Sequence, residues 1–148
     1  MKKIIDVVAG TRPNLVKVYP LLISLKNSKK INKYFKIRFI YTNQHHAKNM
    51  SDFFFSTFGI QKPDIIFKKN NNKNSFGHIF NEYNKLLEKK KSHITIVLGD
   101  VNSTAATSIA AKYHRIKLVH VESGLRSYDM EMPEEINRIM IDSLSDIN

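Results

Sequence analysis

The sequence predicts an α/β protein with a doubly wound, mostly parallel sheet of the Rossmann-like kind. Short apolar runs alternate with segments of helical periodicity along the 148 residues, and a repeated strand–helix–strand order requires right-handed crossovers between parallel strands. The runs are mostly continuous and rich in β-branched residues, which is typical of strands buried on both faces. The length suits one domain with a substantial core, so a single domain over residues 1–148 is expected.

Five runs are predicted to be strands. They are KIIDVVA (3–9), FKIRFIY (35–41), DIIF (64–67), ITIVL (94–98) and KLVHV (117–121). Ligands of such sheets bind where the carboxyl ends of the strands meet, so the residues that follow each run are candidates for a site. Polar corners follow four of them: GTRPN (10–14), TNQHH (42–46), GDVNS (99–103) and ESGLR (122–126).

Helices are predicted between the runs. Apolar residues keep helical spacing in two segments, at Leu15, Val18, Leu22 and Leu25 and at Phe76, Ile79, Phe80, Tyr83 and Leu87. Two further helices are expected, one in SDFFFSTFG (51–59) that ends at Gly59 and an alanine-rich one in STAATSIAAKY (103–113). The low-complexity segment KKNNNKNS (68–75) is expected to be a mobile loop.

The composition excludes several classes of function. Cysteine is absent, which rules out disulfides, thiolate metal sites and a cysteine nucleophile and fits a reducing cytoplasm. Asp6 interrupts the first apolar run too early for a signal peptide, and no segment is long enough to span a membrane. The net charge of +11 comes from lysines dispersed along the chain without an aromatic platform. We therefore expect a soluble cytoplasmic protein with solvated surface lysines and no nucleic-acid or membrane partner.

The first corner is a candidate anion site. Gly10 permits a tight turn and Pro13 suits the first helical position, so backbone N–H groups at this helix start would face a ligand above the strand. Arg12 and Lys17 add positive charge, which is apt for a diphosphate. The spacings of a dinucleotide fingerprint and of a Walker loop are both absent. Ordinary surface charge is the alternative reading of Arg12 and Lys17.

Asp100 and the histidines each have two readings. Asp100 follows a strand directly, near a helix start at Asn102 or Ser103, and is either a site carboxylate or a turn and capping residue. His120 lies within a strand pattern and is predicted to be a hydrogen-bonded core residue. The pair at 45–46 lacks carboxylate or cysteine partners at metal spacing, so no metal site is expected.

The segment HVESGLRSYDMEMPEEINR (120–138) gathers opposed charges. Pro133 is predicted to begin a helix that carries Glu134 in its first turn, and Arg138 lies four residues further along the same face. An exposed i,i+4 ion pair worth about 0.3–0.5 kcal/mol is one reading. The other places Glu122 and Glu134 across a pocket, where two carboxylates divide acid and base roles. Spacing alone leaves both open.

Four motifs together closely resemble the amino-terminal half of non-hydrolysing UDP-N-acetylglucosamine 2-epimerases. They are GTRPNLVKVYPLL, TNQHH, LGDVNSTAATSIAA and HVESGLRSYDMEMPEEINRIMIDSLSD, and they cover nearly the whole chain. The resemblance implies one half of a two-domain, glycosyltransferase-B-like epimerase fold with the active site between the domains. Members of that family interconvert UDP-N-acetylglucosamine and UDP-N-acetylmannosamine, or related UDP-sugars, for cell-surface polysaccharides.

The resemblance also implies a reaction route and residue roles. UDP is eliminated to leave a 2-acetamidoglucal and adds back after the C2 proton is exchanged on the other face, which requires bases and cations together. Arg12 and Lys17 would meet the diphosphate or sugar, and Arg138 would orient Glu134 or stabilise developing charge. The acid/base candidates are Asp100, Glu122 and Glu134. Gln44 and His45 match a region that binds an activating UDP-sugar in several bacterial members, a homodimer is implied, and no metal or nicotinamide cofactor is.

The sequence departs from the family pattern at several points. Asn14 replaces a glutamate after GTRP, Asn43 replaces a glycine and Ser123 replaces an alanine. The sequence stops at Asn148, where the family continues into a carboxy-terminal UDP-binding domain, so the chain is expected to be inactive alone or to act with a separate second half. Two alternatives remain: half of a hydrolysing epimerase, or a non-catalytic basic binding or regulatory module that kept the fold.

Overall fold

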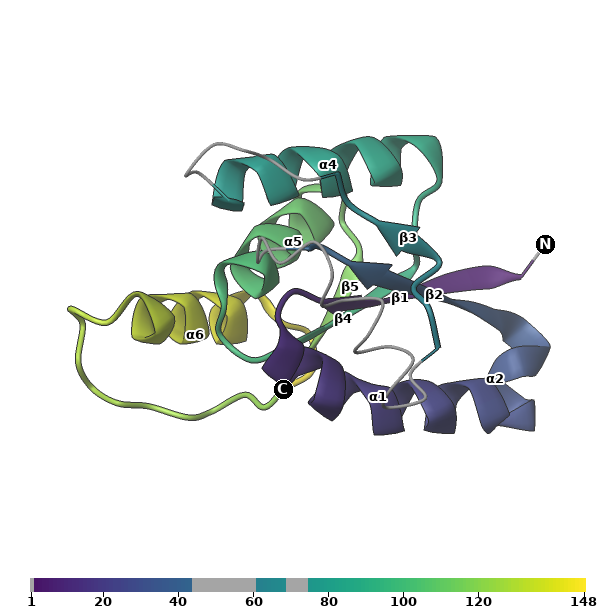
Figure 1. Ribbon diagram of the computed structural model, residues 1–148, viewed down its shortest axis with the longest axis horizontal. Helices are drawn as coiled ribbons and strands as arrows, with labels where there is room; N and C mark the ends of the chain where they lie inside the picture. Colours follow the sequence, from purple (N-terminus) through teal and green to yellow (C-terminus); the bar gives the residue numbers. More distant parts are fainter. Residues whose placement is uncertain (1, 44–60, 69–74) are drawn as a thin grey trace.

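Figure 1 shows the computed structural model of the protein, which describes residues 2–43, 61–68 and 75–148. Its five described strands are all parallel, which confirms the predicted doubly wound α/β architecture. The elements are β1 (Lys3–Ala9), α1 (Arg12–Asn27), α2 (Lys29–Tyr34), β2 (Phe35–Tyr41), β3 (Ile65–Ile66), α4 (Ser75–Lys89), β4 (Ile94–Leu98), α5 (Asn102–Tyr113), β5 (Lys117–Val121) and α6 (Pro133–Leu144).

β1 lies at the centre of the sheet, in the strand order β3-β2-β1-β4-β5. Ala9 at the end of β1 is opposite Tyr41 at the end of β2, and Leu98 at the end of β4 is opposite Val121 at the end of β5. This register brings the carboxyl ends of the strands to one edge of the sheet, so the polar corners that follow the strands lie at that edge.

Helices cover both faces of the sheet. In Figure 1, α1 and α2 lie on one side of it, and α4 and α5 lie on the other. Each side has its own core: apolar residues of α1 pack on Val7, Phe39 and Leu98, whereas α4, α5 and α6 pack on Ile40 and Val97. The alanines of α5 are almost fully buried, because their small side chains let this helix approach the sheet closely. In the described part of the chain, no helix is both long and apolar enough to cross a membrane.

Most predicted boundaries are confirmed. Four of the five strands have the predicted limits, and α6 begins at Pro133. β3 is shorter than predicted, although Asp64 and Phe67 still donate their backbone N–H groups to carbonyls of β2. The predicted helix at 51–59 and most of the loop at 68–75 lie outside the described residues.

The short helix α2 was not predicted, because its lysine-rich sequence reads as a loop. Ser28 starts it: the side-chain oxygen accepts a hydrogen bond from the backbone N–H of Ile31 at 3.3 Å, while its own N–H donates to Ser24 O in the last turn of α1. One serine thus ends one helix and caps the next.

A buried polar cluster ties β1, β2 and α4 together. The guanidinium of Arg38 donates to both carboxylate oxygens of Asp6, at 2.6 and 2.7 Å, and the hydroxyl of Tyr83 donates to Asp6 at 2.8 Å. Arg38 also donates to the carbonyl oxygen of Lys90 at 3.1 Å. Burial and the neighbouring charge of Asp6 raise the pKa of Tyr83 well above its ordinary value.

Replacing Asp6 by asparagine is expected to destabilise the protein by about 3–5 kcal/mol, because the Arg38 charge is then buried without a counterion. Urea denaturation followed by circular dichroism measures this change. Glu82→Gln is the matched control, since Glu82 pairs with the exposed Lys85 at 3.3 Å and its loss is worth no more than about 0.5 kcal/mol. Similar losses of stability in the two variants would contradict the stabilising role of the buried pair formed by Asp6 and Arg38.

Candidate functional site

The corners that follow β1, β4 and β5 converge on a small hollow at the carboxyl edge of the sheet. Its volume is about 180 Å³, and three predicted site residues, Lys17, Asp100 and Glu122, line it. Of the other predicted site residues, Glu134 and Arg138 lie on α6. The side chain of Arg12 and the candidate activator residues Gln44 and His45 lie outside what the structure describes.

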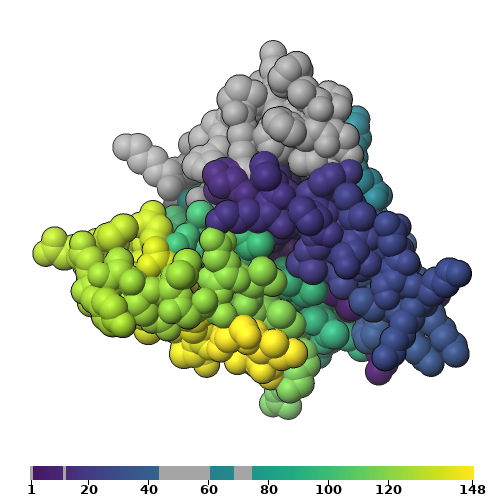
Figure 2. All heavy atoms as spheres, turned by 90° about the horizontal axis from the view of Figure 1, so that it is seen from below, coloured from purple at the N-terminus to yellow at the C-terminus, as the bar shows by residue number. Residues whose placement is uncertain are grey.

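Lys17 and Glu122 form an ion pair across this hollow. The Lys17 Nζ to Glu122 Oε1 distance is 2.5 Å, although the two residues are 105 positions apart in the sequence. In Figure 2 the start of the chain (purple) accordingly lies against the segment that follows β5 (light green). Glu122 has a φ of 69°, in the left-handed region that costs a non-glycine residue on the order of 1 kcal/mol. A strained backbone therefore carries a carboxylate that faces a cation.

Asn14 connects the start of α1 to the end of β4. Its Oδ1 accepts from the backbone N–H of Thr11 at 3.2 Å and from the Thr11 hydroxyl at 2.6 Å, and its Nδ2 donates to Leu98 O at 3.3 Å. A Cβ on Gly99, whose φ is +70°, would lie 3.3 Å from this amide and 3.7 Å from Glu122 Oε2. The asparagine that departs from the family pattern thus has a structural role in this chain.

Arg138 of α6 bridges two carboxylates. Its Nε donates to Asp100 Oδ2 at 2.7 Å, and its Nη1 donates to Glu135 Oε2 at 2.6 Å. Asn137, the neighbouring residue, donates to the backbone carbonyl of Asp100 at 2.8 Å. The hydrogen bond to Asp100 is the main cause that raises the pKa of Arg138, with burial opposing it. The carboxylate that Arg138 contacts across the site is therefore Asp100, a partner that the sequence did not predict.

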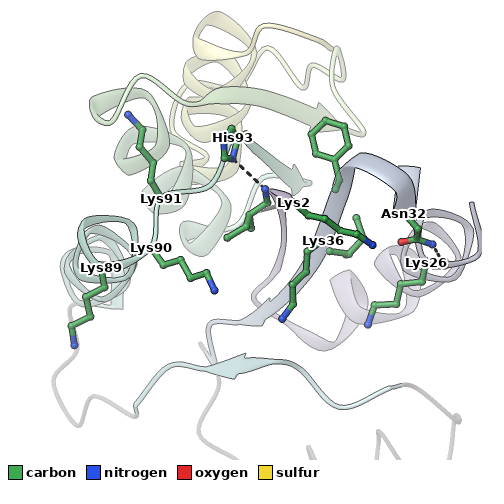
Figure 3. A pocket seen from close by; sticks show the side chains of 11 residues that line it. Lys2, Lys26, Asn32, Lys36, Lys89, Lys90, Lys91 and His93 are labelled. Atoms are coloured by element: carbon green, nitrogen blue, oxygen red, sulfur yellow. Dashed lines mark hydrogen bonds between the residues drawn. The ribbon is translucent and has the colours of Figure 1, made fainter. Parts of the chain in front are cut away.

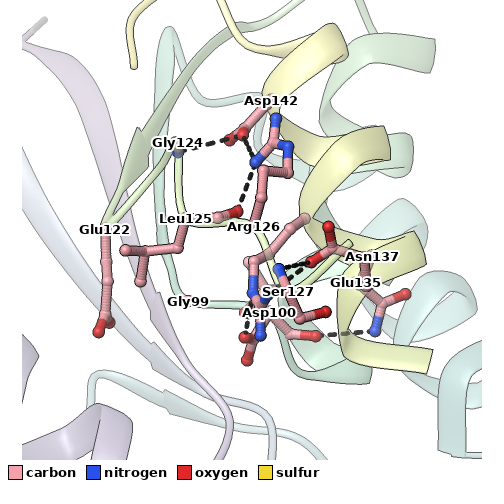
Figure 4. Close-up of polar contacts among 12 residues, drawn as sticks. Gly99, Asp100, Glu122, Gly124, Leu125, Arg126, Ser127, Glu135, Asn137 and Asp142 are labelled. Atoms are coloured by element: carbon pink, nitrogen blue, oxygen red, sulfur yellow. Dashed lines mark hydrogen bonds and ion pairs between the residues drawn. The ribbon is translucent and has the colours of Figure 1, made fainter. Parts of the chain in front are cut away.

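Glu135 makes the contact with Arg138 that spacing had suggested for Glu134. Glu135 is fully buried and also accepts the backbone N–H groups of Ser127 and Tyr128, at 3.0 and 3.1 Å, as Figure 4 shows in part. The hydrogen bond from Ser127 lowers the pKa of Glu135, while burial acts against that change. Glu134 is exposed in the first turn of α6 and does not line the hollow. The described residues therefore do not form the pocket that one of the two readings placed between Glu122 and Glu134.

A second chain of polar contacts fixes the corner after β5. His120 is 1% exposed, with Nδ1 2.6 Å from Asp142 Oδ1 and Nε2 3.0 Å from Gly99 O. Asp142 Oδ2 accepts from Arg126 at 2.7 Å and from the Gly124 N–H at 3.1 Å (Figure 4). Burial opposes ionisation of Asp142, but these hydrogen bonds outweigh it and lower its pKa. The prediction that His120 is a hydrogen-bonded core residue is confirmed.

The sequence contained a signal for these supporting residues. Glu135, Arg138 and Asp142 are spaced i, i+3 and i+7, which places them on one face of α6. That face meets the loop between β5 and α6, and all three residues bind it or the corner after β4. Among residues 2–43, 61–68 and 75–148, no group of three or more metal-ligating side chains is gathered.

A doubly wound domain with charged side chains at the carboxyl edge of its sheet is typical of the α/β proteins that bind anionic ligands such as nucleotides. The chain belongs to the UDP-N-acetylglucosamine 2-epimerase family, whose model matches residues 27–148. This confirms the family suggested by the motifs.

Known relatives agree with that assignment. The chain is 36% identical over 144 residues to a UDP-N-acetylglucosamine 2-epimerase of Methanococcus maripaludis, covering 96% of this chain and 37% of the relative. It is 35% identical to the UDP-2,3-diacetamido-2,3-dideoxy-D-glucuronate 2-epimerase of Pseudomonas aeruginosa, and the match covers 98% of this chain and 40% of that relative. The crystal structure of the Methanocaldococcus jannaschii UDP-GlcNAc 2-epimerase with UDP-GlcNAc and UDP superposes on this chain with a TM-score of 0.85 and 33% sequence identity. The superposition covers 96% of this chain and 38% of that structure. The chain thus spans about two fifths of these relatives.

Acid is expected to destabilise the protein partly through Glu135. Its pKa is lowered from an ordinary value of 4.5, so its stabilisation is complete above that value and is lost as the pH falls through the folded-state pKa. Between about pH 5 and pH 3, the melting temperature of Glu135→Gln should therefore fall less steeply than that of the unchanged chain. Scanning calorimetry measures both slopes. The exposed neighbour provides the control, since Glu134→Gln should keep the original slope, and an unchanged slope in Glu135→Gln would contradict the prediction.

Proposed function

We propose that this chain is the amino-terminal domain of a non-hydrolysing UDP-N-acetylglucosamine 2-epimerase and that the hollow at the carboxyl edge binds the diphosphate and sugar of the substrate. The observation that carries the proposal is the pairing of Lys17 with Glu122 beside the pair formed by Asp100 and Arg138. Cations for a departing diphosphate and bases for a sugar proton then lie at one edge of one sheet.

Lys17 is the best-supported contact for the diphosphate. Its side chain is about half exposed and lines the hollow, and its ammonium group contacts one carboxylate oxygen of Glu122. A bound diphosphate would compete with Glu122 for this ammonium group. Substrate binding would in this way release Glu122 beside the sugar at the moment when a base is needed. Arg12, at the start of α1, would add a second cation.

The proposed acid/base groups are Asp100 and Glu122, which line the hollow, and Glu134, which lies outside it in the first turn of α6. Elimination of UDP removes the C2 proton and breaks the bond between C1 and the diphosphate oxygen, which leaves a 2-acetamidoglucal. Re-addition of UDP with delivery of a proton to the opposite face of C2 completes the epimerisation. Arg138 positions Asp100, and Glu135 in turn positions Arg138.

Turnover would require a second domain. The chain spans about 37% of the Methanococcus maripaludis relative, and the hollow of about 180 Å³ is too small for a whole nucleotide-sugar. A carboxy-terminal domain would supply the opposite wall of the cleft. The relative from Pseudomonas aeruginosa is named for a different UDP-sugar, so substrate choice within the family varies, and we assign UDP-N-acetylglucosamine by the larger number of similar proteins named for it.

Epimerase activity is expected only when the chain is combined with the carboxy-terminal half of a relative. With UDP-N-acetylglucosamine in D₂O, proton NMR should show deuterium entering at C2 in the mixture, and intact UDP-N-acetylmannosamine should form. Glu122→Gln is expected to slow exchange by at least about a hundredfold because it removes an acid/base group. Release of free N-acetylmannosamine and UDP would instead identify the hydrolysing type.

The control for that experiment is Glu131→Gln, which removes a charge from an exposed position in the loop before α6. Its exchange rate should match that of the unchanged chain. Equal rates for Glu122→Gln and Glu131→Gln would contradict the catalytic assignment. Circular dichroism of each variant separates a lost function from a lost fold.

Lys17→Met is expected to weaken UDP binding by about tenfold, because one charge-assisted hydrogen bond to the diphosphate is lost. Titration calorimetry of the reconstituted enzyme with UDP measures this change. Lys117→Met is the matched control, since Lys117 lies at the opposite end of the sheet and pairs with Asp146. Equal affinities of the Lys17 and Lys117 variants would contradict a diphosphate contact at Lys17.

A further inference from the structure

A larger hollow lies at the opposite, amino-terminal edge of the sheet. Its volume is about 680 Å³, within the range typical of small-molecule sites. Six of its lining residues are lysines, contributed by four separate segments of the chain: Lys2, Lys26, Lys36, Lys89, Lys90 and Lys91. We call it the basic hollow. None of the described residues that line it carries a carboxylate.

The wall of the basic hollow is held in place by the core of the protein. Arg38, anchored by Asp6, donates to the carbonyl oxygen of Lys90 at 3.1 Å. The ring atom His93 Nδ1 accepts from the backbone N–H of Ile4 at 3.2 Å, and the backbone N–H of His93 donates to the Ile4 carbonyl oxygen at 2.9 Å. The loop after α4 and the start of β1 are therefore fixed to each other, so the hollow is a preformed feature of the fold.

The lysines are not equivalent. Figure 3 shows the side chains of Lys36 and Lys90 extending to the same side of the hollow, whereas Lys89 and Lys91 point away from it. Lys26 is partly engaged, because its ammonium group donates to Gln61 at 2.6 Å. None of the ion pairs formed by described residues involves Lys36 or Lys90. Like charges brought together without a counterion repel one another, and a bound polyanion relieves that repulsion.

We propose that the basic hollow is a second binding site, for a compact anion that carries two or more phosphate groups. Lys36 and Lys90 would bind the phosphates, with Lys2 beside them and Asn32 and His93 as further polar groups of the lining. Ile4, Ile37 and Phe35 also line the hollow and offer an apolar surface to the body of the ligand. This site is separate from the proposed catalytic hollow, which lies at the other end of the same strands.

A small anion fits this site better than a single-stranded nucleic acid. Nucleic-acid strands bind along grooves with a row of exposed aromatic side chains on which the bases stack. Among the described residues beside the basic hollow, Tyr34 is an exposed aromatic residue, and Lys33 Nζ lies 5.3 Å from its ring centroid. A single exposed ring does not form such a row. A bounded hollow with converging lysines instead matches clustered phosphates on a compact ligand.

Titration calorimetry with inorganic tripolyphosphate tests the proposal on the whole chain at low ionic strength. The double variant Lys36→Gln/Lys90→Gln should bind at least about tenfold more weakly, because two charge-assisted contacts are lost. The double variant Lys85→Gln/Lys117→Gln makes the same change in net charge outside the hollow and should keep the original affinity. Binding that persists in Lys17→Gln and is lost in Lys36→Gln/Lys90→Gln separates this site from the proposed diphosphate site.

Three results would overturn the proposal. Equal losses in the two double variants would show attraction to net charge alone, and loss only in Lys17→Gln would assign the binding to the carboxyl edge. A single-stranded oligonucleotide of about 20 residues that binds through Lys36 and Lys90 and is not displaced by tripolyphosphate would identify a nucleic-acid surface. Displacement of that oligonucleotide by tripolyphosphate would support a phosphate site. These outcomes do not depend on epimerase activity.

Discussion

The backbone of the corner between β4 and α5 joins the separate parts of the candidate site. Leu98 O accepts from Asn14, Gly99 O accepts from His120, and Asp100 O accepts from Asn137. Three side chains from α1, β5 and α6 therefore use three consecutive carbonyl groups as acceptors. Each is a buried or partly buried polar group, and leaving such a group unpaired costs about 1–3 kcal/mol. The positions of Lys17, Glu122 and Arg138 depend on this corner, because it holds α1, β5 and α6, and Glu122 directly follows β5.

The strands and helix starts could be predicted because their signals are local. Continuous β-branched runs mark buried strands, and Pro133 marks the start of α6. The choice between Glu134 and Glu135 is not local. Both suit the first turn of a helix, and both are within helical reach of Arg138. What selects Glu135 is the path of the loop before α6, which brings the N–H groups of Ser127 and Tyr128 to it, and no spacing rule describes that path.

The clustering of the lysines in the folded chain could not be predicted from local sequence signals either. Along the sequence they are dispersed, which favoured the interpretation that they are solvated surface charges. In the folded chain, parallel strands start at one edge and end at the other, so Lys2 and Lys36, near the starts of β1 and β2, become neighbours of Lys90, which follows α4. A parallel sheet therefore brings together residues that precede its strands, although they are far apart in the sequence.

Burial divides the polar residues at the carboxyl edge into two groups. Glu135 and His120 are almost inaccessible and make several hydrogen bonds, so their positions are fixed by the fold. Glu122 and Glu134 are exposed, and a carboxylate that exchanges protons with a substrate needs that access. Exposure also weakens every charge interaction, because water screens it. Under the proposed function, a second domain closing over this edge would exclude water and strengthen the attraction between the cations and a diphosphate. The exposed carboxylates would then act on a sugar held between the two domains.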